Sequence, residues 1–373
     1  MILLTFCLCA PKREEIEKVM EDGVEVVINH LESYKIEGDP TSFVLEEIFT
    51  IDTEKTDVAN TGLTDINYFD VDSEGSIYFL NEQSKENFIL KFDRDGNYVT
   101  AFGRKGQGPG ELQFPIFPLI TGQDEIVVMD QGRKFVIYAK DGSLNKEVLQ
   151  DISTMIVYPL ENGKYLMGKI IIDSESDYDR QYHFSLFSSE FKELATLGRL
   201  RFPNIRRGKK LSGITPGFLW SISKINFYVG NEERGYEIKQ FDFEGNLIRK
   251  IRKDYKKVPI PEEYKKEKLE NMSERRRELT DFPGTFPPFQ CSFVDDRGRL
   301  FVMTYEAGKN PGEYMCDIFN PEGVFIARAS LGGSIDGGII IFPPKSKKNR
   351  FYCIREKESG FKELAVFNIN WDI

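Results

Sequence analysis

One short pattern recurs six times along the chain: a turn followed by three or four apolar residues that favour β-strands. An alternating strand follows each copy and often ends in a tight turn, as at Asp95-Gly96 and Asp141-Gly142, where glycine accepts the positive φ of a hairpin turn. The first pattern lies at residues 74–80, 123–129, 162–168, 223–229, 297–303 and 348–354, and the alternating strands at 88–96, 135–142, 183–191, 236–245, 314–323 and 364–372. A strand-built period of about 40–50 residues is that of a four-stranded propeller blade.

The number of strands predicts how the ring closes. Five of the turns lead into a further strand, at residues 97–103, 143–149, 192–198, 246–252 and 324–331, but no such strand follows 364–372. Residues 43–51 form a strand-like run that precedes the first repeat and belongs to none. Because an open outer edge invites aggregation, we expect residues 43–51 to pair with 364–372. The sequence therefore predicts an all-β fold, a six-bladed β-propeller of four-stranded antiparallel blades closed by an N-terminal strand.

The ends of the chain and one long interval fall outside this repeat. Residues 1–10 are apolar or small and are followed by Pro-Lys-Arg-Glu-Glu, which suggests the remnant of a secretory or lipoprotein signal with a misplaced start codon. We predict a linker or a short helix at 11–42 and the propeller at 43–373. An insertion at 253–288, between the fourth and fifth blades, contains a helical pattern at 261–281 that begins at Pro261.

The N-terminal segment leaves the location of the protein open between two alternatives. Cys7 and Cys9 only loosely fit a lipobox, because Phe6 and Leu8 stand where a small residue belongs, so a lipid anchor on either cysteine is one option. Ten apolar residues are too few to span a bilayer. We expect a periplasmic or cell-surface protein, and the alternative is a cytoplasmic protein with a frayed tail.

Charge and cysteine usage exclude several kinds of partner and site. The formal net charge is −10 and the pI is near 5.1, so binding to nucleic acid is not expected. Cys291, Cys316 and Cys353 share no CxxC spacing, and each lies within an apolar run. We therefore expect buried thiols in a monomer rather than disulfides or a metal site.

A glycine-rich stretch at 103–115 carries a resemblance to a known family. Its Gly103, Gly106, Gly108, Pro109, Gly110, Glu111 and Pro115 resemble the interblade signature of NHL-repeat propellers, and residues 69–81 resemble the turn and strand that follow it. The span 43–373 is similar to bacterial six-bladed propellers that carry an export or lipoprotein signal and mostly lack an assigned function. This resemblance implies the fold and a cell-envelope address, but no activity. A phosphate-binding loop is not expected, because Glu111 follows Gly110 where Lys and then Ser or Thr would be needed.

The residues that could support catalysis are few. Only two histidines occur, His30 and His183, and neither is placed for a triad or a multi-histidine zinc site. A calcium-dependent propeller enzyme of the lactonase type would need acids on the innermost strands, which we predict at residues 66–72, 117–121, 154–159, 218–223, 291–296 and 338–343. There Asp70 is the one free candidate, since Asp72, Asp295 and Asp296 occupy turn positions. The acidic residues at 173–179 are predicted to form a solvated loop. We predict a mostly apolar channel with no catalytic residue, metal site or cofactor.

The crossings between blades favour a binding function. Those at 103–114, 199–216 and 253–288 should emerge on one face of the propeller. Six cations lie in the second crossing with no acid among residues 199–210: Arg199, Arg201, Arg206, Arg207, Lys209 and Lys210. An ordinary solvated loop is the plain alternative to an anion-binding site. Lysines of the insertion, Lys256, Lys257, Lys265, Lys266 and Lys268, are expected to add to the same positive field.

These observations predict a non-catalytic cell-envelope propeller that binds a protein, peptide or glycan partner, of acidic character, on its loop-rich face. The alternative is a hydrolase or lyase with its active site at the mouth of the channel.

Overall fold

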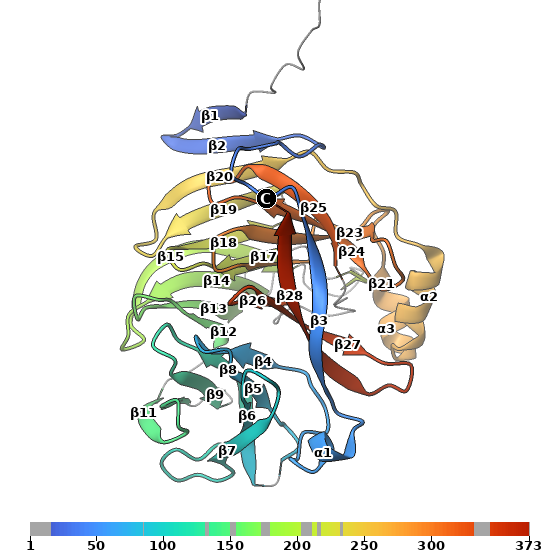
Figure 1. Ribbon diagram of the computed structural model, residues 1–373. Coiled ribbons are helices and arrows are strands. Elements are labelled where there is room, and N and C mark those ends of the chain that lie inside the picture. The colour runs from blue at the N-terminus through green and yellow to red at the C-terminus, as the bar shows by residue number, and fades with distance from the viewer. Residues whose placement is uncertain are drawn as a thin grey trace, which may run out of the picture.

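Six antiparallel sheets form a ring of blades in the computed structural model (Figure 1). It describes residues 16–84, 86–130, 134–149, 154–172, 180–202, 211–214, 218–231, 234–331 and 344–372. The first blade consists of β4 (Phe69–Val71), β5 (Ile77–Leu80), β6 (Asn87–Phe92) and β7 (Tyr98–Arg104). The second consists of β8 (Pro115–Ile120), β9 (Ile126–Asp130), β10 (Lys134–Tyr138) and β11 (Leu144–Leu149). The third consists of β12 (Thr154–Pro159), β13 (Tyr165–Ile172), β14 (Arg180–Phe187) and β15 (Glu193–Phe202).

The remaining blades complete the ring. The fourth blade consists of β17 (Phe218–Ile222), β18 (Asn226–Asn231), β19 (Glu237–Asp242) and β20 (Leu247–Lys253). The fifth consists of β22 (Cys291–Val294), β23 (Leu300–Ala307), β24 (Tyr314–Phe319) and β25 (Phe325–Leu331). The sixth consists of β26 (Lys345–Lys347), β27 (Arg350–Glu356), β28 (Lys362–Asp372) and β3 (Ser42–Asp52). A short helix, α1 (Thr56–Ala59), leads from β3 toward the first blade. The innermost strand of the sixth blade is β26, so it begins after the predicted 338–343, which lies outside the described residues.

The core lies between neighbouring blades rather than within any one of them. Tyr78 and Ile89 of the first blade, for example, pack with Ile126, Val128 and Val136 of the second. Both faces of a blade are therefore covered, and all four residues of β5 are buried. This is why the repeated pattern is a continuous apolar run rather than an alternating one.

The predicted closure of the ring is confirmed. Strand β3 pairs antiparallel with β28, from Phe43 opposite Trp371 to Ile51 opposite Leu364. Figure 1 shows the two strands, blue and dark red, side by side. The first and last parts of the chain thus share one blade, and the outer edge of β28 is covered.

The prediction of a linker or short helix at 11–42 is wrong in its described part. Residues there form a hairpin, β1 (Glu17–Glu21) and β2 (Val24–Asn29), and β2 adds in parallel to β20 at the outer edge of the fourth blade. The turn is Asp22-Gly23, with φ of 51° and 80°. Two residues with positive φ make the turn that matches the twist of a hairpin, so Asp-Gly was the local signal for it.

Ion pairs add to the β2–β20 ladder in holding the hairpin to the blade. Glu21 accepts two hydrogen bonds from the Arg252 guanidinium, at 2.6 and 2.7 Å, and one from Lys250 at 3.2 Å. Glu25 accepts one from Arg249 at 2.6 Å. The hydrogen bonds from Arg252 and Lys250 lower the pKa of Glu21 from its ordinary 4.5 to about 2.

Attachment of the hairpin should therefore weaken in acid. Because the pKa of Glu21 is lower in the docked than in the free hairpin, its contribution is full above about pH 4.5 and is lost as the pH falls through about 2. We expect the amides of β2, corrected for their intrinsic exchange rates, to lose hydrogen-exchange protection between pH 6 and about pH 3. In Glu21→Gln this pH step should shrink while the amides of β5 stay protected, and equal protection of β2 at both pH values would contradict the assignment.

Beyond the hairpin, the chain runs across the outside of the fifth blade to reach β3. The Asn29 side chain donates to the Gly323 carbonyl at 3.0 Å and accepts the Phe325 N–H at 2.8 Å. The Tyr34 N–H donates to the Phe325 carbonyl at 2.8 Å. Residues 17–52 thus connect the outer parts of three successive blades.

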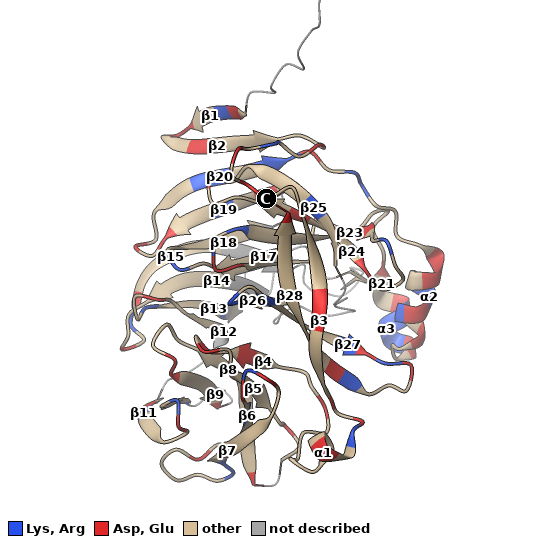
Figure 2. Ribbon diagram, viewed as in Figure 1, with Lys and Arg blue, Asp and Glu red and all other residues tan. Residues whose placement is uncertain are grey.

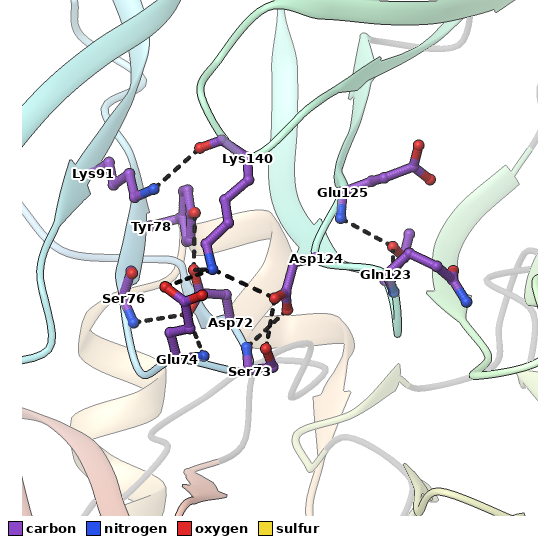
Figure 3. A network of polar contacts seen from close by, with 11 residues as sticks. Asp72, Ser73, Glu74, Ser76, Tyr78, Lys91, Gln123, Asp124, Glu125 and Lys140 are labelled. Carbon is purple, nitrogen blue, oxygen red and sulfur yellow. Dashed lines mark hydrogen bonds and ion pairs between the residues drawn. The ribbon is translucent and has the colours of Figure 1, made fainter.

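The turns that follow the inner strands also join blades, as Figure 3 shows for the first two. The ammonium of Lys140, from the second blade, lies 2.8 Å from the Glu74 carboxylate and 3.5 Å from those of Asp72 and Asp124. Asp72 is fully buried and also accepts hydrogen bonds from the Ser76 N–H and the Tyr78 hydroxyl. The structural role predicted for Asp72 is thereby confirmed.

The insertion between the fourth and fifth blades holds two short helices in place of the single predicted one. They are α2 (Glu262–Glu270) and α3 (Glu274–Leu279), and Ser273 with extended φ and ψ separates them. Asn and Ser at 271 and 273 favour helix ends over helix interiors, which explains the break.

Candidate functional site

A cavity of about 190 Å³ lies on the axis of the ring, where the inner strands end. All six blades contribute to its wall, through Asp70, Leu119, Tyr158, Trp220, Ser292 and Lys345 among others. Its rim consists of the turns that follow the inner strands, including Gly122, Glu161, Lys224 and Asp296. We call this the axial cavity. It lies at the end of the propeller opposite the interblade crossings, because each crossing enters its inner strand at the other end.

Asp70, the predicted free acid of the channel, is not free. Its carboxylate accepts a hydrogen bond from the Lys345 ammonium at 2.6 Å and from the Ile120 N–H at 2.9 Å. These partners belong to the sixth and second blades, so Asp70 joins three blades at the axis. Lys345 was missed because it follows the segment that was predicted to be the inner strand.

The prediction of a mostly apolar channel is also wrong at this end. The Ser292 hydroxyl donates to that of Ser221 at 3.0 Å, across the seam between the fourth and fifth blades. The Trp220 indole N–H donates to the Tyr158 hydroxyl at 2.9 Å. Burial raises the pKa of Tyr158 well above its ordinary value, so this hydroxyl stays protonated at physiological pH. Hydroxyls and charged groups therefore line the cavity.

The other acids at turn positions have structural partners. Asp295 accepts hydrogen bonds from the Arg299 N–H at 2.9 Å and from the Arg299 guanidinium at 2.7 Å. The Arg299 guanidinium in turn lies 3.5 Å from the centre of the Trp371 ring. Asp296 accepts the N–H of Lys348, which adopts a positive φ of 52° in the tight turn between β26 and β27. The predicted structural role of these acids is confirmed.

The histidines and cysteines lie away from the axial cavity. His30 is exposed and lies 2.9 Å from Asp254, and His183 is half-buried on β14. Cys291, Cys316 and Cys353 are buried free thiols, as expected, and burial raises the pKa of Cys353 to about 12. Among the described residues, no three His, Cys, Asp or Glu side chains are grouped to hold a metal ion. The acidic residues at 173–179 lie outside the described residues.

At the opposite end, two of the three predicted crossings lie side by side. Strand β16 (Leu211–Ser212) pairs in parallel with β21 (Thr280–Asp281), which follows α3. The Gly213 N–H donates to the Asp281 carbonyl at 2.6 Å. A Cβ added at Gly213 would lie 2.4 Å from the Phe282 ring, so only glycine permits this close approach. The end of the propeller that carries these crossings is called the crossing face below.

The six cations predicted to bind there are only partly within the structure. Arg199 and Arg201 are on β15, opposite His183 and Gln181, but their side chains lie outside the described residues. Arg206, Arg207, Lys209 and Lys210 lie outside them altogether.

The expected positive field is weakened on the helices of the insertion, where acids lie beside the lysines, whereas Lys256 and Lys257 precede α2 and are exposed. Lys265 pairs with Glu262 at 2.6 Å, and Lys266 lies 3.9 Å from Glu270. Figure 2 shows acidic and basic residues intermixed on α2 and α3. Opposite charges at i, i+3 and i, i+4 largely cancel on the helices. The helices therefore contribute surface to the crossing face but little net charge.

The glycine-rich crossing at 103–114 closes on its own carboxylate. Glu111 accepts the Gly108 N–H at 2.9 Å, and a Cβ at Gly106 would lie 1.9 Å from the same carboxylate. Leu112 is fully buried beneath the loop. The glycines thus allow a compact turn between two blades, and the Glu111 carboxylate occupies the Gly108 N–H that a phosphate would need.

Comparisons with known proteins agree with this architecture. No curated protein matches the sequence. A crystal structure of a Bacteroides fragilis protein described as exported has 13% sequence identity and a TM-score of 0.53, covering 93% of this chain and 100% of that one. A member of the DUF4221 family from Bacteroides vulgatus has 11% identity and a TM-score of 0.49, covering 97% of this chain and 100% of that one.

Within the described residues, no helix has the length and hydrophobicity needed to cross a bilayer.

Residues 57–273 match the DUF5128 family, which is described as a 6-bladed β-propeller. This match spans more than half of the chain and includes the first four blades. The chain therefore belongs to the DUF5128 family of six-bladed β-propellers.

Proposed function

We propose that this protein is a non-catalytic propeller of the cell envelope that binds an acidic protein, peptide or glycan on its crossing face. The cell-envelope address is supported by the Bacteroides fragilis protein of similar fold, which is described as exported. The function is carried by one observation: β16, from the crossing at 199–216, pairs in parallel with β21 of the insertion at 253–288, so the described parts of the two crossings meet on one face.

The insertion is anchored, although the ring does not need it for closure. Phe286 stacks on Tyr305 of β23 with ring centroids 4.3 Å apart, and Tyr264 of α2 meets Phe286 edge-on at 5.1 Å. Ile260 and Phe289 are buried where the insertion leaves and rejoins the propeller. An ordered loop fixed on a rigid scaffold loses little entropy on binding a partner, which favours recognition there.

The alternative function, a hydrolase or lyase acting at the channel mouth, needs an acid that is free to act. The acid best placed for that role is Asp70, and its oxygens are engaged by Lys345, Val71 and Ile120. These contacts argue against Asp70 as a catalytic acid or base.

A salt-dependent binding assay tests this proposal. The quadruple variant Arg206→Ser, Arg207→Ser, Lys209→Ser, Lys210→Ser should bind poly-L-glutamate and alginate about tenfold or more weakly than wild type at low salt, because each of the four cations is expected to contribute up to roughly 1 kcal/mol to binding of a polyanion. The difference should largely vanish at roughly 0.5 M salt, where screening is strong.

A matched variant controls for net charge. Arg94→Ser, Lys164→Ser, Lys192→Ser, Arg297→Ser removes four cations from turns at the other end of the propeller and should bind like wild type. If both quadruple variants lose affinity equally, or neither does, the crossing face is not the binding surface.

A further inference from the structure

The rim of the axial cavity carries four charged side chains that alternate in sign from blade to blade. Glu161 comes from the third blade, Lys224 from the fourth, Asp296 from the fifth and Lys347 from the sixth, and all four line the cavity. Glu161 and Lys224 are exposed, and Asp296 and Lys347 are half-buried. Two negative and two positive groups therefore surround one opening.

These rim charges differ from the other charges of the cavity in forming no ion pair with any residue that the structure describes. Asp70 is paired with Lys345 at 2.6 Å, and Asp295 with Arg299 at 2.6 Å. Within the part of the chain that the structure describes, no ion pair engages Glu161, Lys224, Asp296 or Lys347. Asp296 accepts one backbone N–H, which leaves its remaining acceptor sites available.

The size of the cavity limits what can enter. Its volume of about 190 Å³ is below the roughly 300–1,000 Å³ of sites for drug-sized ligands, so it suits a molecule of about one amino-acid residue. The wall offers hydroxyls at Ser221 and Ser292. Because the inner strands pair on one side only, their free edges also present backbone N–H and C=O groups to the cavity.

We propose that the axial cavity binds a small zwitterion of the α-amino-acid class. The ammonium group lies toward the carboxylates of Glu161 and Asp296, and the carboxylate group lies toward the ammonium groups of Lys224 and Lys347. A ligand with only one charge can form ion pairs only with the two rim groups of opposite sign, and a neutral sugar can form none. This site is separate from the crossing face, so it does not depend on the function proposed above.

One glycine helps to place the rim. A Cβ at Gly122, on the second blade, would lie 2.1 Å from the Glu161 carboxylate and 3.1 Å from the Glu161 Cα. Gly122 thus leaves the space that the Glu161 side chain occupies at the mouth. It is a positioning residue, and Gly122→Ala should weaken binding through Glu161 alone.

The test is titration calorimetry of the full chain with L-alanine, L-glutamine and L-leucine, each compared with its N-acetyl and its amide derivative. We expect saturable binding of at least one free amino acid, and binding about tenfold or more weaker for both of its derivatives, since each lacks one charge-assisted contact. Lys224→Ala and Glu161→Ala should each weaken the binding about tenfold.

Glu190→Ala and Lys192→Ala are matched controls, because both residues lie on an exposed turn of the third blade outside the cavity and should leave the affinity unchanged. Thermal unfolding without ligand confirms that each variant is folded. Three results would overturn the proposal: no saturable binding of any of the three amino acids, N-acetyl or amide forms that bind as tightly as the parent, or rim variants that behave like the controls.

Discussion

Deletion of residues 1–52 is expected to abolish cooperative unfolding of the propeller, because it removes β3 from the sixth blade. Strand β3 pairs with β28 over its whole length and contributes Ile51 to the core between the sixth and first blades. Its loss exposes the edge of β28 together with Leu364 and Val366, which are fully buried. Since the whole stability of a domain is typically about 5–15 kcal/mol, losing one strand of a closed ring should consume most of it. Thermal and urea unfolding followed by circular dichroism measure this loss.

Two point substitutions on β3 separate the packing of the strand from the deletion of a whole segment. Ile51 is 1% exposed and Ile48 is 38% exposed. Ile51→Ala should cost about 2–5 kcal/mol by leaving a cavity, and Ile48→Ala should cost much less. A truncated chain with wild-type stability, or equal effects at the two positions, would contradict the closure.

Asp317→Asn is expected to lower the free energy of unfolding by about 3–5 kcal/mol, because it leaves a buried cation without its counter-charge. Asp317 is 1% exposed between the fourth and fifth blades. Its carboxylate lies 3.5 Å from the Lys253 ammonium and 2.9 Å from the Arg328 guanidinium, and it accepts the Tyr236 hydroxyl at 3.0 Å. Arg328 keeps Glu306 as a partner at 2.7 Å, but no second carboxylate pairs with Lys253 among the described residues.

A second substitution shows whether Lys253 carries that cost. The double variant Asp317→Asn, Lys253→Met should recover part of the lost stability, since it removes the unpaired charge and keeps an apolar side chain of similar length. Asp95→Asn, at a 67% exposed aspartate, should change stability by no more than about 0.5 kcal/mol. Urea unfolding of the wild type and the three variants measures these differences. A double variant that is less stable than Asp317→Asn alone would show that unpaired Lys253 is not the source of the lost stability.

The fold could be predicted because its strongest signals are local. Each blade is buried on both faces by its neighbours, so strands such as Ile77–Leu80 are uninterrupted apolar runs with a glycine turn before them. A count of the strands in each repeat identified 43–51 as the partner of 364–372, because a closed ring leaves no strand edge unpaired in its last blade.

The docking of the hairpin at 17–29 on the fourth blade could not be predicted from such local signals. Strand β1 is polar and exposed, and Val26 and Val27 are fully buried only because β2 lies against the fourth and fifth blades. Its attachment depends on Arg249, Lys250 and Arg252, more than two hundred residues away. The Asp22-Gly23 turn and the β-branched run of β2 mark a hairpin locally, but they do not show which distant edge it joins.

The sequence by itself determined the number of blades, the strand that closes them, the turns that carry Asp72 and Asp295, and the place of the insertion. Only the tertiary structure decided what the charged residues do. Asp70 meets Lys345 at a separation of 275 residues, and Lys265 and Lys266 pair with acids of their own helix. The four rim charges meet because the ring brings the ends of successive inner strands, with the turns that follow them, to one opening. Strand patterns are set by burial along the chain, whereas the charge around a site is set by side chains that ring closure brings to one opening from distant parts of the chain.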